Sequence, residues 1–358
     1  MRVEGRSSSQ RVAVLAFVLL SVASLAPAQS PNALPPGPKP LDVSPEWKQL
    51  VGIYLDEHSK HSFILLERDE KLFWRDEKGV SLPFLVNDGI VFPPNEGGSV
   101  IGHSIARDEA GRVTGFCYLN FCYTRTDAGV DTSRSYHLTP SRPVDELRRA
   151  ALAAQPPVEN GSFRRPDLVE LAPLDTTIHL DIRYATANDF LGTPVYSQAR
   201  AFLQRPAVEA LLRVQQKLRP LGYGLLIHDA YRPWYVTKIF WDATPPEGKI
   251  FVADPVQGSR HNRGCAVDLT LYDLASGKPI EMPGTYDEMS PRSYPDYPGG
   301  TSLQRWHRDL LRRAMESEGF TVYEAEWWHF DYKDWKEYPI LNVPFEKLGP
   351  DSGSGTVH

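Results

Sequence analysis

The sequence predicts two folded units in series, a small all-β module and a larger region that mixes helices and strands. Its 358 residues correspond to about two domains at roughly 150 residues each. From residue 51 to about residue 123, short apolar and aromatic runs recur about every ten residues between turn signals, as antiparallel strands do. After about residue 167, helical and extended patterns alternate, which indicates a mixed α and β fold.

Residues 1–28 are predicted to be a secretory signal peptide. A positively charged start precedes an apolar run over residues 12–25, and Ala26-Pro27-Ala28 supplies the small residues of a cleavage site. The alternative is an uncleaved membrane anchor, but the run is shorter than the roughly 20 residues that a spanning helix needs. We therefore expect an exported, periplasmic protein with no membrane span in the mature chain.

Composition places the chain near the averages for soluble globular proteins. Hydrophobic residues make up 41% and charged residues 23%, which excludes a disordered chain. The formal net charge is -6, and loss of Arg2, Arg6 and Arg11 together with Glu4 makes the mature chain more negative. Nucleic acid is therefore not an expected partner, because a phosphate backbone requires a basic surface. The oligomeric state stays open.

A proline-rich linker is predicted over residues 29–45, and the β-rich module over residues 46–128. Turns are expected at Asn87-Asp88-Gly89 and Glu109-Ala110-Gly111, because glycine and asparagine reach positive φ at little cost. The expected strands cover residues 51–55, 63–66, 71–74, 82–86, 90–92, 101–106 and 113–119.

The β module resembles the small lipocalin-like modules appended to bacterial serine hydrolases. The resemblance lies in Val51-Gly52-Ile53-Tyr54 and in the stretch over residues 107–115. The module holds no constellation of titratable groups, so no chemistry is assigned to it. Its histidines are expected to be surface or packing residues: His58, His61 and His103.

The three cysteines are too few for a disulfide framework. If Leu119-Asn120 forms a two-residue turn, Cys117 and Cys122 face each other across a hairpin and can form a disulfide. In one continuous strand they would point to opposite faces, so the sequence leaves both arrangements open. Cys265 is expected to be a small buried side chain.

Residues 129–166 are predicted to be a second linker, with one connecting helix over residues 143–154 that Pro156-Pro157 ends. In the large domain, residues 167–348, amphipathic helices are expected at 207–219 and 302–318, followed by the stop signals Gly222 and Gly319. Extended segments are expected at 224–227 and 320–323, and a flexible tail at 349–358.

Four side chains of the large domain form a chemical constellation. His261 and Asp268 lead into an apolar strand, and Glu326 and His329 follow about sixty residues later. Two histidines and one carboxylate suit Zn²⁺, and three protein ligands leave a fourth position for water. Glu326 would then accept the proton of that water while zinc polarises a scissile carbonyl. Each pair taken alone is common in proteins, so residue types alone leave ordinary structural pairs as the alternative.

The segment over residues 174–332 closely resembles the bacterial zinc D-alanyl-D-alanine dipeptidases, a family that includes the vancomycin-resistance dipeptidase. The resemblance implies a compact α+β fold with one zinc ion per chain held on a small sheet. The matching stretches are Arg183-Tyr184-Ala185-Thr186-Ala187-Asn188-Asp189-Phe190, Gly192-Thr193-Pro194-Val195-Tyr196, Gly222-Tyr223-Gly224-Leu225-Leu226, Asp229-Ala230-Tyr231-Arg232-Pro233, residues 259–271 and residues 326–329.

By position, the resemblance implies that His261, Asp268 and His329 bind the zinc ion and that Glu326 is the general base. Arg232 matches the family arginine at the substrate carbonyl, where a permanently charged guanidinium can stabilise an oxyanion. A structural ion pair between Arg232 and a carboxylate such as Asp229 is the alternative.

Three further positions are assigned to substrate binding. Ser259 and Asp287 match the positions that hold the free amino end of the dipeptide, where a carboxylate can pair with the ammonium; a solvated loop acid is the alternative for Asp287. Tyr184 is expected to line the pocket or to pack in the core. The remaining histidines of the domain are expected not to be ligands: His179, His228 and His307.

The sequence therefore predicts an exported zinc metallopeptidase that hydrolyses D-alanyl-D-alanine, with D-alanine recycling in cell-wall metabolism as its role. The stretch between Tyr235 and Ser259 is shorter than in resistance-type enzymes, and Cys265 replaces a small residue, which leaves the accepted substrate length open. One alternative is a D,D-carboxypeptidase acting on peptidoglycan stem peptides, which offer no free amine to Asp287. The other is a non-catalytic zinc-binding module on a hedgehog-like fold, which would not need Glu326 and Arg232.

Overall fold

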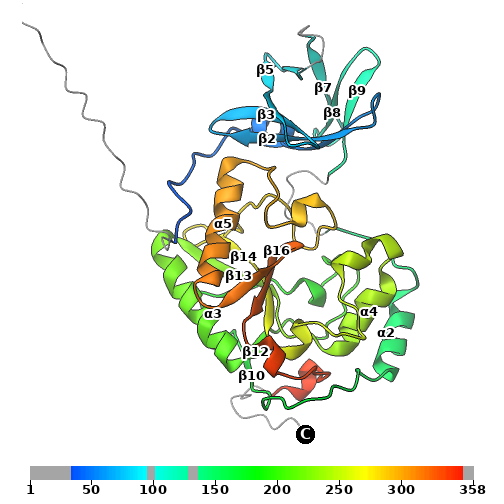
Figure 1. Ribbon diagram of the computed structural model, residues 1–358, viewed down its shortest axis with the longest axis vertical. Helices are drawn as coiled ribbons and strands as arrows, with labels where there is room; N and C mark the ends of the chain where they lie inside the picture. The colour runs from blue at the N-terminus through cyan, green and yellow to red at the C-terminus, as the bar shows by residue number, and fades with distance from the viewer. Residues whose placement is uncertain (1–33, 95–100, 128–135, 350–358) are drawn as a thin grey trace, which may run out of the picture. The chain divides into compact units, whose positions relative to one another are not determined.

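The computed structural model describes residues 34–94, 101–127 and 136–349 (Figure 1). The predicted signal peptide, residues 29–33 of the first linker, residues 129–135 of the second linker and nearly all of the predicted tail lie outside these residues. Among the described residues, no helix combines the length and the apolar character needed to cross a membrane.

The first folded region is a nine-stranded antiparallel sheet in the order β4-β3-β2-β1-β9-β8-β7-β6-β5. Because β1 pairs with β9, and the edge strands β4 and β5 are separated only by Phe84, the sheet curls into a near-barrel (Figure 1). The predicted antiparallel all-β module is confirmed. The strands are β1 (Gly52–Asp56), β2 (Ser62–Arg68), β3 (Lys71–Asp76), β4 (Ser81–Pro83), β5 (Leu85–Asn87), β6 (Ile90–Phe92), β7 (His103–Arg107), β8 (Val113–Tyr118) and β9 (Phe121–Arg125).

Three details of this module differ from the prediction, and one of them is β9 (Phe121–Arg125), which was not among the expected strands. The single strand expected over residues 82–86 is two strands, because the chain turns at the buried Phe84 after Pro83, which has no N–H for the ladder. A short helix that was not predicted, α1 (Pro45–Leu50), begins at the end of the proline-rich stretch. Pro45 is tolerated there because the first turn of a helix needs no N–H from it, and Ser44 caps the helix.

The hairpin of β8 and β9 decides between the two cysteine arrangements. Leu119, with φ 51°, and Asn120 form its turn, and Cys117 lies opposite Cys122 in the register. The two cysteines form a disulfide bond, while Cys265 is free and buried.

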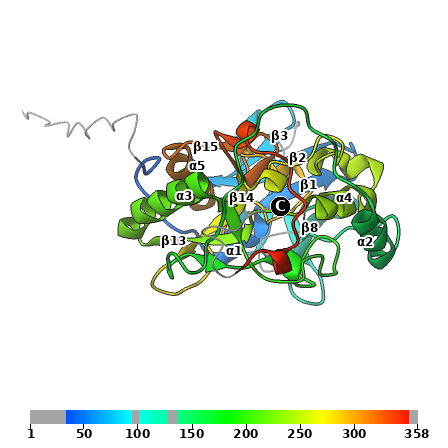
Figure 2. The ribbon, with the colours of Figure 1, turned by 90° about the horizontal axis from the view of Figure 1, so that it is seen from below.

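The second region is an α+β domain built around a five-stranded sheet in the order β11-β13-β14-β16-β15. In both views, α3 and α5 lie on one side of this domain and α2 and α4 on the opposite side (Figure 1, Figure 2). Its helices are α2 (Val144–Ala153), α3 (Arg205–Leu218), α4 (Trp234–Ala243) and α5 (Ser302–Glu316). Its strands are β10 (Leu168–Glu170), β11 (His179–Leu180), β12 (Phe202–Gln204), β13 (Tyr223–Asp229), β14 (Ala266–Asp273), β15 (Phe320–Tyr323) and β16 (Glu326–Tyr332).

Helix α4 is the main element that the sequence pattern did not reveal. Seven of its ten residues are buried, and its polar side consists only of the ion pair between Lys238 and Asp242, so the amphipathic period is too weak to stand out in the sequence. It follows Tyr231-Arg232-Pro233 directly, and its Phe240 lines the same cavity as Arg232.

Candidate metal centre and active site

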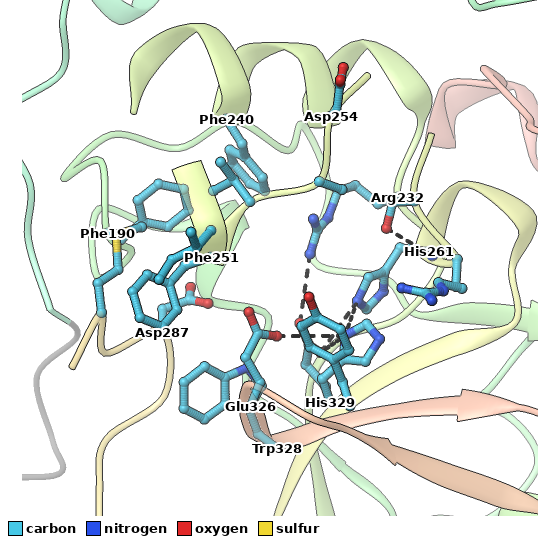
Figure 3. Close-up of a pocket in the computed structure, with 18 of the residues that line it drawn as sticks. Phe190, Arg232, Phe240, Phe251, Asp254, His261, Asp287, Glu326, Trp328 and His329 are labelled. Carbon is cyan, nitrogen blue, oxygen red and sulfur yellow. Dashed lines mark hydrogen bonds and ion pairs between the residues drawn. The ribbon is translucent and has the colours of Figure 1, made fainter. Parts of the chain in front are cut away.

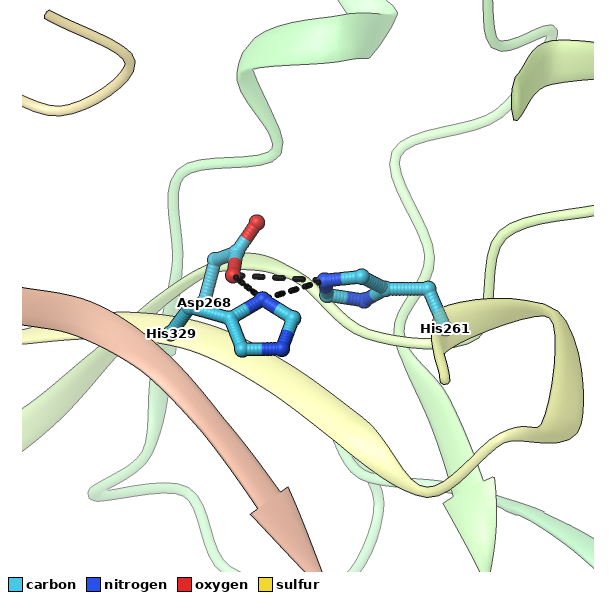
Figure 4. Close-up of side chains that lie close together, drawn as sticks. All are labelled: His261, Asp268 and His329. Atoms are coloured by element: carbon cyan, nitrogen blue, oxygen red, sulfur yellow. Dashed lines mark hydrogen bonds and ion pairs between the residues drawn. The ribbon is translucent and has the colours of Figure 1, made fainter. Parts of the chain in front are cut away.

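The two antiparallel strands β14 and β16 bring the predicted metal ligands together. Asp268 on β14 lies directly opposite His329 on β16, so both side chains project from the same face of the sheet. His261 comes from a short 3-10 turn, His261–Arg263, and Gly264 with φ 68° leads the chain from this turn into β14. All three side chains are buried, and one ligand atom from each lies within 4.8 Å of the others (Figure 4).

The three atoms that converge are His261 Nε2, His329 Nδ1 and Asp268 Oδ1. The two nitrogens are 3.0 Å apart, and Asp268 Oδ1 lies 3.3 Å from His261 Nε2 and 3.0 Å from His329 Nδ1. When both histidines are neutral, each of these three atoms presents a lone pair to the other two. The three atoms therefore cannot satisfy one another by hydrogen bonding. Nitrogen and oxygen donors in this number and arrangement fit a tetrahedral metal site with one open position.

Each ligand is held in place by a second contact. His261 Nδ1 lies 2.7 Å from the Ala230 carbonyl oxygen, and His329 Nε2 lies 3.0 Å from Asp331 Oδ1. Asp268 Oδ2 accepts a hydrogen bond of 3.1 Å from the Tyr286 hydroxyl. These contacts occupy one atom of each side chain and leave His261 Nε2, His329 Nδ1 and Asp268 Oδ1 free to bind a metal. Metal ligands are usually oriented by such outer contacts.

Glu326 begins β16 and lies beside the centre. Its Oε2 is 3.8 Å from His329 Nδ1. Burial, only partly offset by His329, raises the pKa of the Glu326 carboxyl to about 7. A carboxyl group with a pKa near neutrality is well suited to accept and return a proton.

Arg232 makes an ion pair and also faces the centre. Its Nε and Nη2 atoms lie 2.9 Å and 2.8 Å from Asp229 Oδ2, and Nη2 is 3.6 Å from Asp268 Oδ2. Asp229 Oδ1 accepts a 2.6 Å hydrogen bond from the Tyr196 hydroxyl. The alternative ion pair therefore exists, and it orients the guanidinium toward the metal centre instead of away from it.

A cavity of about 300 Å³ contains the predicted residues in one place (Figure 3). Its lining includes every catalytic, metal and substrate residue that the sequence predicts: Tyr184, Arg232, Ser259, His261, Asp268, Asp287, Glu326 and His329. Aromatic side chains, including Phe190, Phe240 and Trp328, complete the wall. None of the other three histidines of the domain belongs to the buried ligand group.

Asp287 presents an unpaired oxygen in this cavity. Its Oδ1 accepts a 3.1 Å hydrogen bond from the Tyr184 hydroxyl, whereas its buried Oδ2 has no hydrogen-bond partner in the described structure. Burial, reinforced by the nearby Asp268, raises the pKa of the Asp287 carboxyl well above its usual range. The sequence did not reveal the supporting roles of Asp331 and Tyr286, although Asp331 shares a strand face with His329 by its spacing of two residues.

The family comparison agrees with this geometry. The Peptidase M15 model, described as D-ala-D-ala dipeptidase, matches residues 164–346. The chain belongs to the Peptidase M15 family. Within this M15 chain the matched segment contains all the residues of the cavity, whereas the β module lies outside it.

Several bacterial D-alanyl-D-alanine dipeptidases are similar to this M15 chain. The enzyme of Escherichia coli K12 is 35% identical over 179 residues, which cover 50% of this chain and 91% of that protein. The Enterococcus faecalis enzyme is 35% identical over 190 residues, covering 46% and 92%. The Streptomyces coelicolor enzyme is 34% identical over 186 residues, covering 47% and 92%.

Proposed function

We propose that this M15 metallopeptidase hydrolyses D-alanyl-D-alanine to two D-alanines and that its metal is zinc. The observation that carries the proposal is the single cavity in which the three potential metal ligands meet the partly buried Glu326, an arginine and a carboxylate with one unpaired oxygen. Hydrolysis of a dipeptide uses each of these groups at a different place: the metal and Glu326 at the attacking water, the arginine at the carbonyl oxygen, and the carboxylate at the free amino end.

The donor atoms of His261, Asp268 and His329 would hold the ion. Zinc in such a site lowers the pKa of a coordinated water and polarises the carbonyl that is attacked. Glu326, at the edge of this group, accepts the proton of the attacking water and returns it to the leaving amine.

Arg232 stabilises the charge that develops on the carbonyl oxygen. Its guanidinium is held by Asp229 and packs 4.9 Å from the centre of the Phe240 ring, so it is oriented before the reaction begins. A donor preorganised in this way contributes about 3 kcal/mol to transition-state stabilisation.

Asp287 binds the free amino end of the dipeptide. A buried carboxylate oxygen without a partner is costly, and a substrate ammonium would satisfy it. Ser259 lies in the same cavity as a polar neighbour, although its hydroxyl already accepts a 3.2 Å hydrogen bond from the His261 backbone N–H. A D,D-carboxypeptidase substrate, whose corresponding nitrogen is acylated, would leave Asp287 unpaired.

The export of the protein is part of the proposal. The predicted signal peptide over residues 1–28 supports a periplasmic enzyme that acts on dipeptide released from cell-wall peptides and so recycles D-alanine. The lipocalin-like assignment of the β module stays a prediction based on its two short sequence cues.

The test is release of D-alanine from the free dipeptide and from its N-acetylated form by the purified mature protein. We expect the free dipeptide to be cleaved at least about 100-fold faster, activity to vanish with a chelator, and zinc to restore it. Preferential cleavage of the acetylated form would favour the carboxypeptidase alternative. Undiminished activity after complete metal removal would contradict the metal mechanism.

A further inference from the structure

Buried hydrogen bonds within the loop that carries Asp287 fix the conformation of this loop. Asp287 has φ 58°, an uncommon conformation for a residue other than glycine, so the loop must hold it there. Next to it, Glu288 Oε2 accepts hydrogen bonds of 3.0 Å and 3.2 Å from the N–H and hydroxyl of Thr285. Across the loop, Arg292 Nε donates a 3.0 Å hydrogen bond to the Pro283 carbonyl oxygen.

Arg292 connects this loop to a residue of the N-terminal half of the chain. Its Nη1 atom donates a 3.0 Å hydrogen bond to Asp127 Oδ2, and the two side chains are 4% and 2% exposed. Asp127 follows β9 by two residues, and its Oδ1 accepts a 2.5 Å hydrogen bond from Arg125 Nε. One buried carboxylate is therefore shared between two buried guanidinium groups.

Arg125 is in turn fixed to the beginning of the β module. Its Nη1 and Nη2 atoms donate hydrogen bonds of 2.7 Å and 2.5 Å to the carbonyl oxygens of Gln49 and Val51, respectively. The absence of a side chain at Gly52 makes room for this contact, because a Cβ atom there would lie 2.6 Å from Arg125 Nη2. The contacts thus run without interruption from residues 49–51, just before the first strand of the β module, to the loop of Asp287.

We infer that Asp127 is a positioning residue for the amino end of the substrate, and that the β module thereby completes the dipeptidase site. Without the Asp127 carboxylate, Arg125 would lose its buried ion-pair partner, and Arg292 would keep only the longer ionic contact of 3.6 Å between its Nε and Glu288 Oε2. The attachment of the loop to the β module would be lost, and the loop would shift. If the loop moves Asp287 by about 1 Å, its contact with the ammonium group of the bound dipeptide is weakened. The inference rests on the proposed role of Asp287 as the ammonium-binding residue.

The first test measures the loop directly, without activity. Hydrogen exchange is compared in the full-length mature protein for the wild type and Asp127→Ala. We expect exchange at least about 10-fold faster in peptides covering residues 283–293, with β14 unchanged. Asp108→Asn is the matched control, because Asp108 pairs with Arg112 within a hairpin of the same module. Equal loop exchange in Asp127→Ala and the wild type would overturn the inference.

The second test separates positioning from general damage. For the free dipeptide we expect Asp127→Ala to raise KM about 10-fold, with kcat changed less than about 3-fold and the bound metal retained. Arg292→Ala should have a similar effect, and the double variant should be little worse than either single one. An unchanged KM, or additive effects in the double variant, would overturn the inference. A wild type that prefers the acetylated peptide would instead refute the proposed function, while the exchange result would still decide whether Asp127 holds the loop.

Discussion

The two histidines of the metal centre use opposite ring nitrogens. His261 directs Nε2 to the centre because the Ala230 carbonyl oxygen engages Nδ1, and His329 directs Nδ1 there because Asp331 engages Nε2. A ring nitrogen can serve a metal only when its proton is elsewhere, so the outer partner selects the tautomer. Substitution of Asp331 would thus act on the metal without touching it.

Glu326→Gln tests the proton transfer. Glutamine has the shape of glutamate but cannot accept the proton of the attacking water, so kcat should fall at least about 100-fold while the zinc content stays at that of the wild type. Steady-state kinetics and metal analysis measure both quantities. The exposed Glu324, changed to glutamine, is the matched control and should retain full activity. Full activity of Glu326→Gln would show that another group is the base.

Asp189 predicts a pH dependence of stability away from the metal centre. It is fully buried, its Oδ1 accepts the N–H of Leu191 and of Thr193, and its Oδ2 has no partner in the described structure. Burial raises the pKa of its carboxyl to about 6. Since the folded state then binds this proton more tightly than the unfolded state, the stabilisation is present below about pH 4 and is lost as pH rises through 6.

Asp189→Asn removes this titration. Its free energy of unfolding, relative to the wild type, should therefore increase by up to about 3 kcal/mol between pH 4 and pH 7. Urea unfolding at several pH values measures how the stability difference between the two proteins changes with pH. Any constant destabilisation by the new amide is the same at every pH and does not affect this change. A constant difference between the two proteins over this range would contradict the predicted pKa of Asp189.

Strand pairing determines whether the active-site residues meet at all. Asp268 lies opposite His329 only in the register observed for β14 and β16. Because side chains alternate between the faces of a strand, a shift by one residue would turn one ligand to the other face. The buried apolar residues of β14, among them Leu269 and Leu271, hold this register through the core.

The hairpin of β8 and β9 allows a test at the level of a single element. Cys117→Ala removes a disulfide whose sequence separation is 5, and the short loop predicts a loss of about 2 kcal/mol in the free energy of unfolding. Denaturant unfolding of the purified protein measures it. Reduction of the wild type should reproduce the loss, and reductant should not affect the variant further. Equal stability of oxidised wild type and variant would exclude a stabilising role for this bond.

The whole molecule carries a prediction about processing. Protein expressed from the complete sequence should be recovered from the periplasmic fraction with Gln29 as its first residue, because Ala26 and Ala28 provide the small side chains that cleavage requires. Intact-mass measurement and N-terminal sequencing determine this residue. Recovery of the uncleaved chain would contradict the predicted signal peptide.

Elements with a strong local pattern were predictable, and buried elements without one were not. Helices α3 and α5 alternate apolar and polar faces, so their positions follow from periodicity alone. Helix α4 is buried on nearly all sides and gives no such signal. The cysteine pair depended on whether Leu119 entered a turn with positive φ, which residue types permit but do not require.

The residue types of this chain indicated a candidate metal site with a nearby base, and the resemblance to the zinc D-alanyl-D-alanine dipeptidases assigned the role of each residue. His261, Asp268, Glu326 and His329 could be named without coordinates. Their mutual distances, the partners that orient them and the contact of Asp127 with Arg292 came from the folded chain alone. These contacts join residues that are far apart in sequence, and they form only when strands and loops pack against one another. Local sequence patterns do not determine which distant atoms this packing brings together.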